Sequence, residues 1–323
     1  MTEFPKVSII VPVKPGGRVG ALAGIRALDY PTDAFEVFVA EGKCPSCQRN
    51  SAASAATGDI LCFLDDDSLV APEHLQRMVR HFSDPRVSAV GGPSLTPATD
   101  SLLQQSFGMA LSSLVGGGGM RNRYRRFGTV RTTGDQELIL CNLSFRRESF
   151  LQNGGFDERL YPNEENELME RIIRGGGMLV HDPDIAVDRS QRPTIGAFCR
   201  QLYSYGRGRG EQTVMSGVIK PITFVPSLFL IYLLLLSLIR KPVYYLPLLC
   251  YLLMTVALSI RELFRARRPR SVLFLPVVFV LIHICYGFGM LRGLVVQRFR
   301  KEGHPGGEVA LRRVKEFGQP FTG

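Results

Sequence analysis

Short apolar runs alternate with helix-like segments through the first 200 residues of the chain. The runs are typical of buried strands and lie at residues 7–13, which are rich in β-branched side chains, and at 35–40, 60–64, 87–90, 138–145 and 178–180. Helical patterns between them cover residues 17–28, 47–56, 72–82 and 164–173. Strands separated by single helices predict βαβ units, and therefore an α/β fold built on a parallel sheet.

From residue 221 onward the pattern changes to three long apolar segments, at residues 221–239, 242–260 and 271–291. Each is close to the roughly 20 residues that a helix needs to cross a bilayer. The first two segments contain no charged residue. We therefore predict an α/β domain over residues 1–215, a small helical membrane domain over residues 216–295, and a basic tail over residues 296–323. The polar start of the chain predicts no signal peptide.

The formal net charge is +10, and basic residues gather beside the apolar segments, at positions 240–241, 261–270 and 292–301. Basic flanks favour the cytoplasmic side of a membrane and contact with anionic lipids, rather than nucleic-acid binding. We predict a location in the cytoplasmic (inner) membrane, with the α/β domain in the cytosol. The first two segments would then form a hairpin, and a third full span would place the tail outside. Because Gly287 and Gly289 lie in the third segment and Gly293 directly follows it, a re-entrant or interfacial arrangement stays open.

Three consecutive carboxylates, Asp65, Asp66 and Asp67, directly follow the apolar run 60–64. Side chains alternate along a strand, so Asp65 and Asp67 can share one face while Asp66 points away. Clustered carboxylates are the ligands that Mg²⁺ and Mn²⁺ prefer. The alternative is an acidic N-cap for the helix that begins near Pro72. The position at the carboxyl end of a strand, where ligands bind in parallel α/β sheets, favours the cation.

Two further patterns have no assigned chemistry. Four glycines at positions 116–119 precede a cluster of arginines that ends at Arg126, which predicts a mobile basic loop. Such a loop is either a connector or a lid over a phosphate-bearing or lipid ligand. Cys44 and Cys47 are the one close cysteine pair in the sequence, and without a second pair they predict reduced thiols rather than a zinc site.

Six segments, in their order and spacing, together resemble the motifs of an inverting glycosyltransferase of family 2 with the GT-A fold. They are the strand at 7–13, the aspartate motif at 63–67, the segments at 142–147 and 154–158, the acidic motif at 163–168 and the basic motif at 200–209. With its three C-terminal apolar segments, the chain is similar to exopolysaccharide glucosyltransferases of the succinoglycan type. The resemblance implies a GT-A (Rossmann-like) domain that binds a nucleotide sugar, with a UDP-sugar as donor and a lipid-linked acceptor.

The resemblance assigns the donor and metal site to the carboxyl ends of the strands. Asp67 would bind Mg²⁺ or Mn²⁺ directly, Asp65 would bind it through water or contact the ribose, and Asp66 would support them. Glu41 stands where the family usually has an aspartate that contacts uracil. The other positions implied in donor binding are Pro12, Arg49 and Asn50. For the last two, the alternative is a polar surface at the start of a helix.

Inversion by direct displacement needs a general base that takes the proton of the acceptor hydroxyl. Glu165 occupies the position of the family's catalytic aspartate, and Glu164 is the rival candidate. The alternative is that these carboxylates only interact with the positive end of a helix dipole. Residues implied in contacting the diphosphate or the acceptor are Asn142, Arg200, Gln201, Arg207 and Arg209. The arginines of this set could instead contact lipid head groups beside the membrane.

The function that the resemblance implies is transfer of a hexose from a UDP-sugar to a hydroxyl of a polyprenyl-diphosphate-linked saccharide or another lipid-linked acceptor, in exopolysaccharide or glycolipid assembly. Two alternatives share the fold: a polyprenyl-phosphate sugar synthase, and a non-catalytic membrane scaffold. A bare phosphate acceptor would need no strong base at Glu165, and a scaffold would show no metal-dependent turnover. The sequence does not predict the oligomeric state.

Overall fold

The computed structural model describes residues 4–239, 241–263, 269–297 and 308–322. Seven of the basic positions beside the apolar segments lie outside these ranges: Arg240, Arg265, Arg267, Arg268, Arg298, Arg300 and Lys301. The chain divides into two compact units. The first comprises Met1–Leu95, Asn122–Arg189 and Glu302–Gly323, and the second comprises Thr96–Arg121 and Ser190–Lys301. Each unit is therefore assembled from separate stretches of chain, whereas the sequence predicts consecutive domains.

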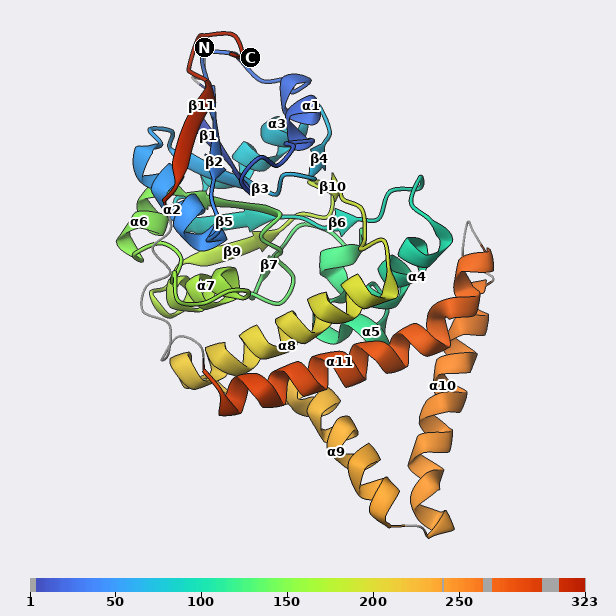
Figure 1. Ribbon diagram of the computed structural model, residues 1–323. Helices are drawn as coiled ribbons and strands as arrows, with labels where there is room; N and C mark the ends of the chain where they lie inside the picture. Colours follow the sequence, from blue (N-terminus) through green and yellow to red (C-terminus); the bar gives the residue numbers. More distant parts are fainter. Residues whose placement is uncertain (1–3, 240, 264–268, 298–307, 323) are drawn as a thin grey trace. The chain divides into compact units, whose positions relative to one another are not determined.

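A mixed sheet of eight strands forms the centre of the first unit (Figure 1). Its strands, in spatial order, are β11 (Ala310–Lys315), β2 (Phe35–Glu41), β1 (Val7–Val13), β3 (Ile60–Leu64), β8 (Asn142–Arg146), β5 (Val87–Gly91), β9 (Met178–His181) and β7 (Arg131–Thr133). β1 is parallel to β2 and β3, and β5 is parallel to β9, as the βαβ pattern predicts. β8 is antiparallel to both β3 and β5, so the sheet is mixed rather than wholly parallel. The chain between β5 and β8 is not a single crossover helix, which parallel neighbours would need.

A second, small sheet lies beside the end of β3. Its middle strand, β10 (Val187–Asp188), is antiparallel to β4 (Leu69–Val70) and parallel to β6 (Ser94–Leu95). β4 begins just after the three aspartates, and β10 ends just before Arg189. The pairing therefore brings a late segment of the unit beside the aspartate turn.

All four predicted helices of the first unit are present, with shifted bounds. They are α1 (Ala21–Arg26), α2 (Pro45–Ala55), α3 (His74–Val79), which continues into a 3₁₀ turn (Arg80–Ser83), and α7 (Glu164–Arg174). A further helix, α6 (Arg147–Gln152), has no counterpart in the prediction. α3 begins after Glu73, its N-cap residue, and β4 separates it from the aspartates. The aspartates therefore do not cap this helix, which removes the alternative explanation for them.

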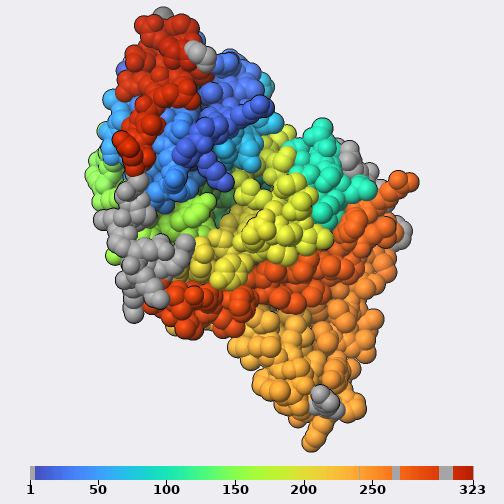
Figure 2. All heavy atoms as spheres, in the orientation of Figure 1, coloured from blue at the N-terminus to red at the C-terminus, as the bar shows by residue number. Residues whose placement is uncertain are grey.

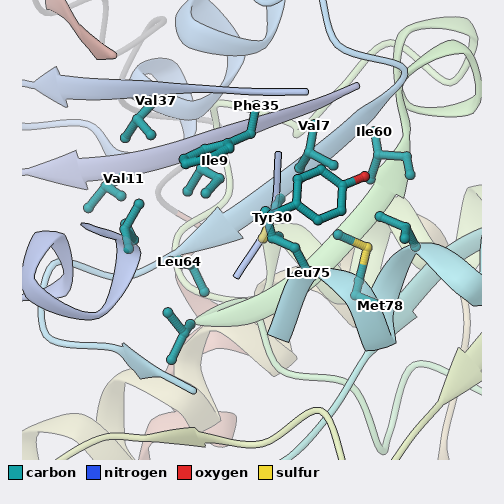
Figure 3. Close-up of a cluster of buried hydrophobic side chains, with 14 of the residues drawn as sticks. Val7, Ile9, Val11, Tyr30, Phe35, Val37, Ile60, Leu64, Leu75 and Met78 are labelled. Atoms are coloured by element: carbon teal, nitrogen blue, oxygen red, sulfur yellow. The ribbon is translucent and has the colours of Figure 1, made fainter. Parts of the chain in front are cut away.

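β1 is buried on both faces, which explains its unbroken apolar run. Val7, Ile9 and Val11 pack in one cluster with side chains from β2, β3 and α3 (Figure 3). Ile10 belongs to a second cluster, which includes Phe63 of β3. Because side chains alternate along a strand, β1 contributes to the core on both faces of the sheet.

The last strand, β11, comes from the tail and extends the sheet beyond β2 (Figures 1 and 2). Figure 2 shows this red segment against the blue N-terminal part of the first unit. Lys315 donates from Nζ to Thr32 O at 2.7 Å and to Phe35 O at 3.0 Å. Arg313 Nε lies 3.5 Å from Glu36 Oε2. Polar contacts of basic side chains therefore help to attach the tail to the sheet. Because the strand is rich in basic residues, its sequence lacks the apolar pattern that predicts a strand.

The second unit is helical. Its helices are α4 (Leu102–Leu111), α5 (Leu114–Gly117), α8 (Ile195–Ser216), α9 (Val225–Leu238), α10 (Leu246–Leu263) and α11 (Leu275–Val295), with 3₁₀ turns at Pro221–Phe224, Pro242–Tyr245 and Pro269–Phe274. Three segments are helical, long and apolar enough to cross a membrane, at Pro221–Leu238, Pro242–Leu263 and Arg270–Val295. The three predicted apolar helices are thereby confirmed, and α11 is one uninterrupted helix.

The glycine-rich segment at 116–119 is helical, which corrects the prediction of a mobile loop. Leu114–Gly117 form α5, and Gly118–Tyr124 form a 3₁₀ helix. A Cβ at Gly116 would clash with Ala110 O, and a Cβ at Gly117 would clash with Leu111 O. The absence of these side chains therefore allows close packing against the end of α4.

α8 and α11 pack against each other through two matched pairs of glycines. Gly206 and Gly210 lie one helical turn apart on α8, and Gly289 and Gly293 have the same spacing on α11. A Cβ at any of the four would clash with backbone atoms of the other helix. Small residues at this spacing let two helix backbones approach closely.

Gly206→Ala is expected to lower the free energy of unfolding by about 1–3 kcal/mol, as overpacking does. The added Cβ would clash with Tyr286 O. Gly196→Ala is the matched control, because Gly196 is exposed on the same helix and its nearest neighbour is the end of the flexible Arg200 side chain, at 3.6 Å. Thermal unfolding of the two variants in detergent checks the prediction, and an equal effect of both would contradict it.

Candidate active site

The three aspartates form a turn directly after β3. Asp66 O accepts a hydrogen bond from Ala21 N at 2.9 Å, and Asp65 O accepts one from Ser68 N at 3.1 Å. The side chain of Asp65 is 21% exposed and that of Asp67 is 44% exposed. Partial burial raises the pKa of Asp66, and the charges of Asp67 and Asp65 raise it further. Backbone contacts therefore fix a turn whose carboxylates remain accessible.

One arginine pairs with two of these aspartates. Arg189 follows β10, and its backbone N–H donates to Leu95 O at 2.9 Å. Its Nη2 lies 3.1 Å from Asp65 Oδ2, and its Nε lies 2.6 Å from Asp67 Oδ1. The Asp65 and Asp67 carboxylates thus converge on the same guanidinium group.

A second arginine links the aspartate turn to α7. Arg49, on α2, donates from Nη2 to Asp65 Oδ1 at 2.9 Å and from Nη1 to Glu164 Oε1 at 3.1 Å. The neighbouring Gln48 donates to backbone oxygens at the ends of β1 and β2, which attaches the first turn of α2 to the sheet. The Arg49 side chain is only 6% exposed, so its contacts with Asp65 and Glu164 are largely shielded from water.

Glu164 is the first residue of α7 and is fully buried. Burial, and then the charge of Glu165, raise the pKa of Glu164 to about 8, and the Arg49 guanidinium opposes this shift only in part. Glu164 Oε2 has no hydrogen-bond partner among the residues that the structure describes. This carboxyl group is therefore largely protonated at neutral pH, where it is a poor base.

The raised pKa of Glu164 predicts a stability term that is lost as the pH rises. The native state keeps the Glu164 proton up to about pH 8, whereas the unfolded chain loses it near the ordinary value of 4.5. The stabilisation is therefore complete below pH 4.5 and disappears as the pH rises through 8.

Glu164→Gln cannot titrate and should lack this loss. We expect its melting temperature, relative to that of the wild type, to rise steadily between about pH 5 and pH 9. Parallel melting curves in detergent measure the difference. A difference that is constant across this range would contradict the buried, protonated state of Glu164.

Glu165 is oriented through one of its two oxygens. Asn166 donates from Nδ2 to Glu165 Oε1 at 2.8 Å, and Arg123 Nη1 lies 3.6 Å from the same oxygen. Arg123 is itself fixed, because its Nη2 donates to Asn166 Oδ1 and Asp135 O, both at 2.6 Å. These contacts hold the carboxylate through Oε1.

The aspartate turn suits a divalent cation. Two hard carboxylate ligands, from Asp65 and Asp67, already converge on a positive group, the Arg189 guanidinium. Within the described ranges, no cluster of three or more His, Cys, Asp or Glu side chains could hold an ion. Mg²⁺ is commonly bound through one or two carboxylates, with substrate phosphates and water as the other ligands. The donor set therefore fits an ion that binds together with a phosphate-bearing substrate.

Two predicted donor-site residues lie at the ends of β1 and β2. Pro12 is buried in β1, opposite Ala40 of β2. Glu41 is the last residue of β2, and its Oε1 accepts a hydrogen bond from Gly16 N at 3.0 Å. Both residues belong to the same edge of the sheet as the aspartate turn, because β1, β2 and β3 are parallel.

Two predicted amide residues hold backbone segments. Asn50 donates from Nδ2 to Phe156 O at 2.8 Å and accepts from Phe156 N at 3.0 Å. Asn142 is 2% exposed and donates from Nδ2 to Ile185 O at 2.6 Å. In this structure both side chains therefore position loops of the first unit.

The four residues of the basic motif lie on α8, in the second unit: Arg200, Gln201, Arg207 and Arg209. Gln201 accepts from Arg192 Nε at 3.0 Å and donates to Tyr205 OH at 2.6 Å. Arg207 donates from Nη2 to Ser204 Oγ at 3.2 Å. The alternating glycines and arginines are therefore part of a regular helix rather than a loop.

Cys44 and Cys47 form a disulfide at the start of α2, so the prediction of reduced thiols is wrong for this pair. Cys44 is the N-cap residue and Pro45 is the first residue of the helix. A proline at this position fits the first helical turn, which brings side chains three residues apart together. The other cysteines of the described chain are free: Cys62, Cys141, Cys199, Cys250 and Cys285.

Two arginines of the site have no assignment from the sequence. Arg123 lies in the basic cluster near the four glycines, so its charge is visible, but its contact with Glu165 is not. Arg189 lies outside every motif and is 122 positions from Asp67. Its one sequence signal is the strand-like pair that precedes it.

The family described as glycosyl transferase family group 2 matches residues 60–260. The chain is similar to the pre-mycofactocin glycosyltransferase of Mycobacterium tuberculosis, with 27% identity over 195 residues, which cover 60% of this chain and 38% of the relative. It is also similar to the succinoglycan biosynthesis protein ExoA of Rhizobium meliloti, with 26% identity over 167 residues, 50% of this chain and 47% of the relative. The match thus spans less than half of the length of these relatives.

A solved structure with a related fold is the mannosyltransferase PcManGT from Pyrobaculum calidifontis, in complex with GDP-Man and Mn²⁺. The TM-score is 0.54 at 16% identity, over 91% of this chain and 88% of that chain. This likeness concerns the fold alone, and it confirms the predicted α/β fold of GT-A type. The family match covers more than half of the chain and includes the aspartate turn and α7. The chain therefore belongs to glycosyl transferase family group 2.

Proposed function

We propose that the chain is a metal-dependent inverting glycosyltransferase of the inner membrane. It would transfer a hexose from a UDP-sugar to a hydroxyl of a polyprenyl-diphosphate-linked saccharide or another lipid-linked acceptor. One observation carries the proposal. Asp65 and Asp67 converge on the Arg189 guanidinium, and Arg49 connects Asp65 to the acidic start of α7. The aspartate turn is thus linked by Arg49 to Glu164, the residue directly before the candidate base Glu165.

The donor would bind at the carboxyl ends of β1, β2 and β3. A divalent ion held by Asp65 and Asp67 would neutralise the charge that develops on the diphosphate leaving group. The GDP-Man and Mn²⁺ in PcManGT support a nucleotide sugar and a divalent ion. Pro12 and Glu41 are proposed to lie beside the nucleoside, because they lie at the carboxyl ends of β1 and β2, and β1 pairs with β3.

Glu165 would be the general base. It would take the proton of the acceptor hydroxyl while the hydroxyl oxygen attacks the anomeric carbon and the bond from that carbon to the diphosphate oxygen breaks. A single displacement of this kind inverts the anomeric configuration. Glu164 would stay protonated near neutral pH and accept the hydrogen bond from Arg49, which leaves the charge of the pair on Glu165.

A lipid-linked acceptor is proposed because three helical segments are long and apolar enough to cross a membrane. The name of the succinoglycan relative supports a role in exopolysaccharide assembly. Arg200, Gln201, Arg207 and Arg209 of α8 are proposed to contact the diphosphate of the acceptor or of the donor, because arginine forks suit phosphate oxygens. Basic residues beside the apolar helices, among them Arg261 and Arg292, favour a cytosolic catalytic unit.

A screen of donors and acceptors with the full chain in detergent tests the proposal. UDP-glucose, UDP-galactose, UDP-N-acetylglucosamine and GDP-mannose are each supplied with Mn²⁺, Mg²⁺ or EDTA. The acceptors are a polyprenyl-diphosphate-linked saccharide and a polyprenyl monophosphate. We expect transfer from a UDP-hexose to the saccharide, only with metal. Transfer to the monophosphate alone would indicate a polyprenyl-phosphate sugar synthase, and no metal-dependent turnover would indicate a scaffold.

A further inference from the structure

Arg189 contacts both candidate metal ligands but has no task in the proposed mechanism. Its guanidinium uses two different nitrogens to reach two different carboxylates, at 3.1 Å from Asp65 and 2.6 Å from Asp67. Its side chain is 17% exposed, so the contact is partly shielded from solvent. Two carboxylates held close together repel each other, and Arg189 supplies the positive charge that stabilises the turn.

A divalent ion on the same two carboxylates would conflict with this arrangement. The ion and the guanidinium are both positive, and both need Asp65 and Asp67 as partners. The backbone of Arg189 is held by its hydrogen bond to Leu95 O and by the strand pairing of β10. Only the side chain can therefore move when an ion takes the carboxylates.

Arg49 does not have this conflict. It binds Asp65 through Oδ1, whereas Arg189 binds Asp65 through Oδ2. Arg49 also pairs with Glu164 and is more deeply buried than Arg189. Arg49 can thus keep Asp65 oriented while the Oδ2 side of the carboxylate changes its partner.

We propose that Arg189 is an exchangeable counter-cation. Without metal, its guanidinium holds Asp65 and Asp67; once a divalent ion has replaced the guanidinium on these two carboxylates, Arg189 binds the donor diphosphate. The diphosphate in this inference comes from the proposed function, on which it rests. An arginine released beside a newly bound diphosphate finds an anion that its planar fork fits well. The site would thereby avoid an unpaired arginine in either state.

Two binding measurements on Arg189→Met test the exchange. Mn²⁺ binding without nucleotide is followed through the electron paramagnetic resonance signal of free Mn²⁺. UDP binding at saturating Mn²⁺ is followed by calorimetry. We expect Mn²⁺ to bind about tenfold more tightly, because a competing positive charge is removed, and UDP to bind about tenfold more weakly. Opposite changes are the signature, since a damaged fold would weaken both.

Arg86→Met is the matched control. Arg86 forms a bidentate pair with Asp84 on the surface of the same unit, so its loss should leave both affinities unchanged. Unchanged or weaker Mn²⁺ binding by Arg189→Met, or unchanged UDP binding, would overturn the proposal. The Mn²⁺ measurement needs no sugar donor, so it distinguishes this failure from a failure of the proposed transferase activity in the donor screen.

Arg189→Lys covers the case in which Arg189→Met does not fold. A lysine keeps the charge but cannot reach two carboxylates through two separate nitrogens. We expect the same opposite changes in Mn²⁺ and UDP binding, by smaller factors. Affinities of Arg189→Lys equal to those of the wild type would overturn the role of the two-carboxylate contact.

Discussion

Glu165→Gln should lower transfer to a hydroxyl acceptor by about 100- to 10,000-fold, the usual contribution of a general base. Glutamine keeps the shape of the side chain and can still accept from Asn166 Nδ2, but it cannot take a proton. Donor binding should therefore be unchanged. The rate of transfer under saturating donor and metal, measured beside the affinity for UDP, checks both parts of the expectation.

Glu167→Gln is the control on the same helix. Glu167 pairs with Arg171 at 2.7 Å across one turn of α7, so its replacement removes a carboxylate without touching Glu165. Transfer by this variant should stay close to that of the wild type. If Glu164→Gln lost transfer while Glu165→Gln kept it, the base would be Glu164. If Glu164→Gln and Glu165→Gln both kept transfer, the acceptor would be a group that needs no base, such as a lipid phosphate.

Arg49→Met should destabilise the first unit by about 3–5 kcal/mol, as the loss of one partner of a buried ion pair does. The variant leaves Asp65 and Glu164 without the cation that both contact. The loss should be smaller at acidic pH, because Glu164 can then keep its proton. Chemical denaturation at about pH 6 and pH 9 measures the difference.

The double variant Arg49→Met/Glu164→Gln separates charge from packing. Its glutamine needs no counter-cation, so it should recover part of the stability lost in Arg49→Met at alkaline pH. Addition of Mn²⁺ should stabilise the wild type more than either variant, since Arg49 orients Asp65. Equal losses in the single and double variants would show that Arg49 stabilises the unit by packing alone.

The parts of the site that pattern reading predicts are those whose geometry is local. Asp65–Asp67 follow a short apolar run, and the end of a buried strand fixes where such residues lie. Glu164 and Glu165 begin a helix whose apolar positions recur at helical spacing. Arg49 could be placed at the start of α2 for the same reason, although its link between Asp65 and Glu164 could not.

The parts that could not be predicted depend on contacts between distant segments. Arg189 reaches the aspartates because β10 pairs with both β4 and β6, which are two-residue strands with no pattern of their own. The raised pKa of Glu164 follows from complete burial, which a glutamate in a sequence does not indicate. The order of the sheet has the same origin, because β8 enters it after a long excursion of the chain through the second unit.

The strand β11 limits how the chain between it and β2 can be threaded through a bilayer. Strand pairing joins residues 310–315 to residues 37–41, so in the proposed membrane protein both segments would lie on the same side of the bilayer. The number of complete crossings between them would therefore be even. Of the three apolar segments, Arg270–Val295 is the most buried, with 39% of its apolar 18-residue stretch buried in the protein against 17% and 11% for the others. Two crossings, by α9 and α10, would satisfy the count, and α11 would then stay on the cytosolic side in the proposed orientation.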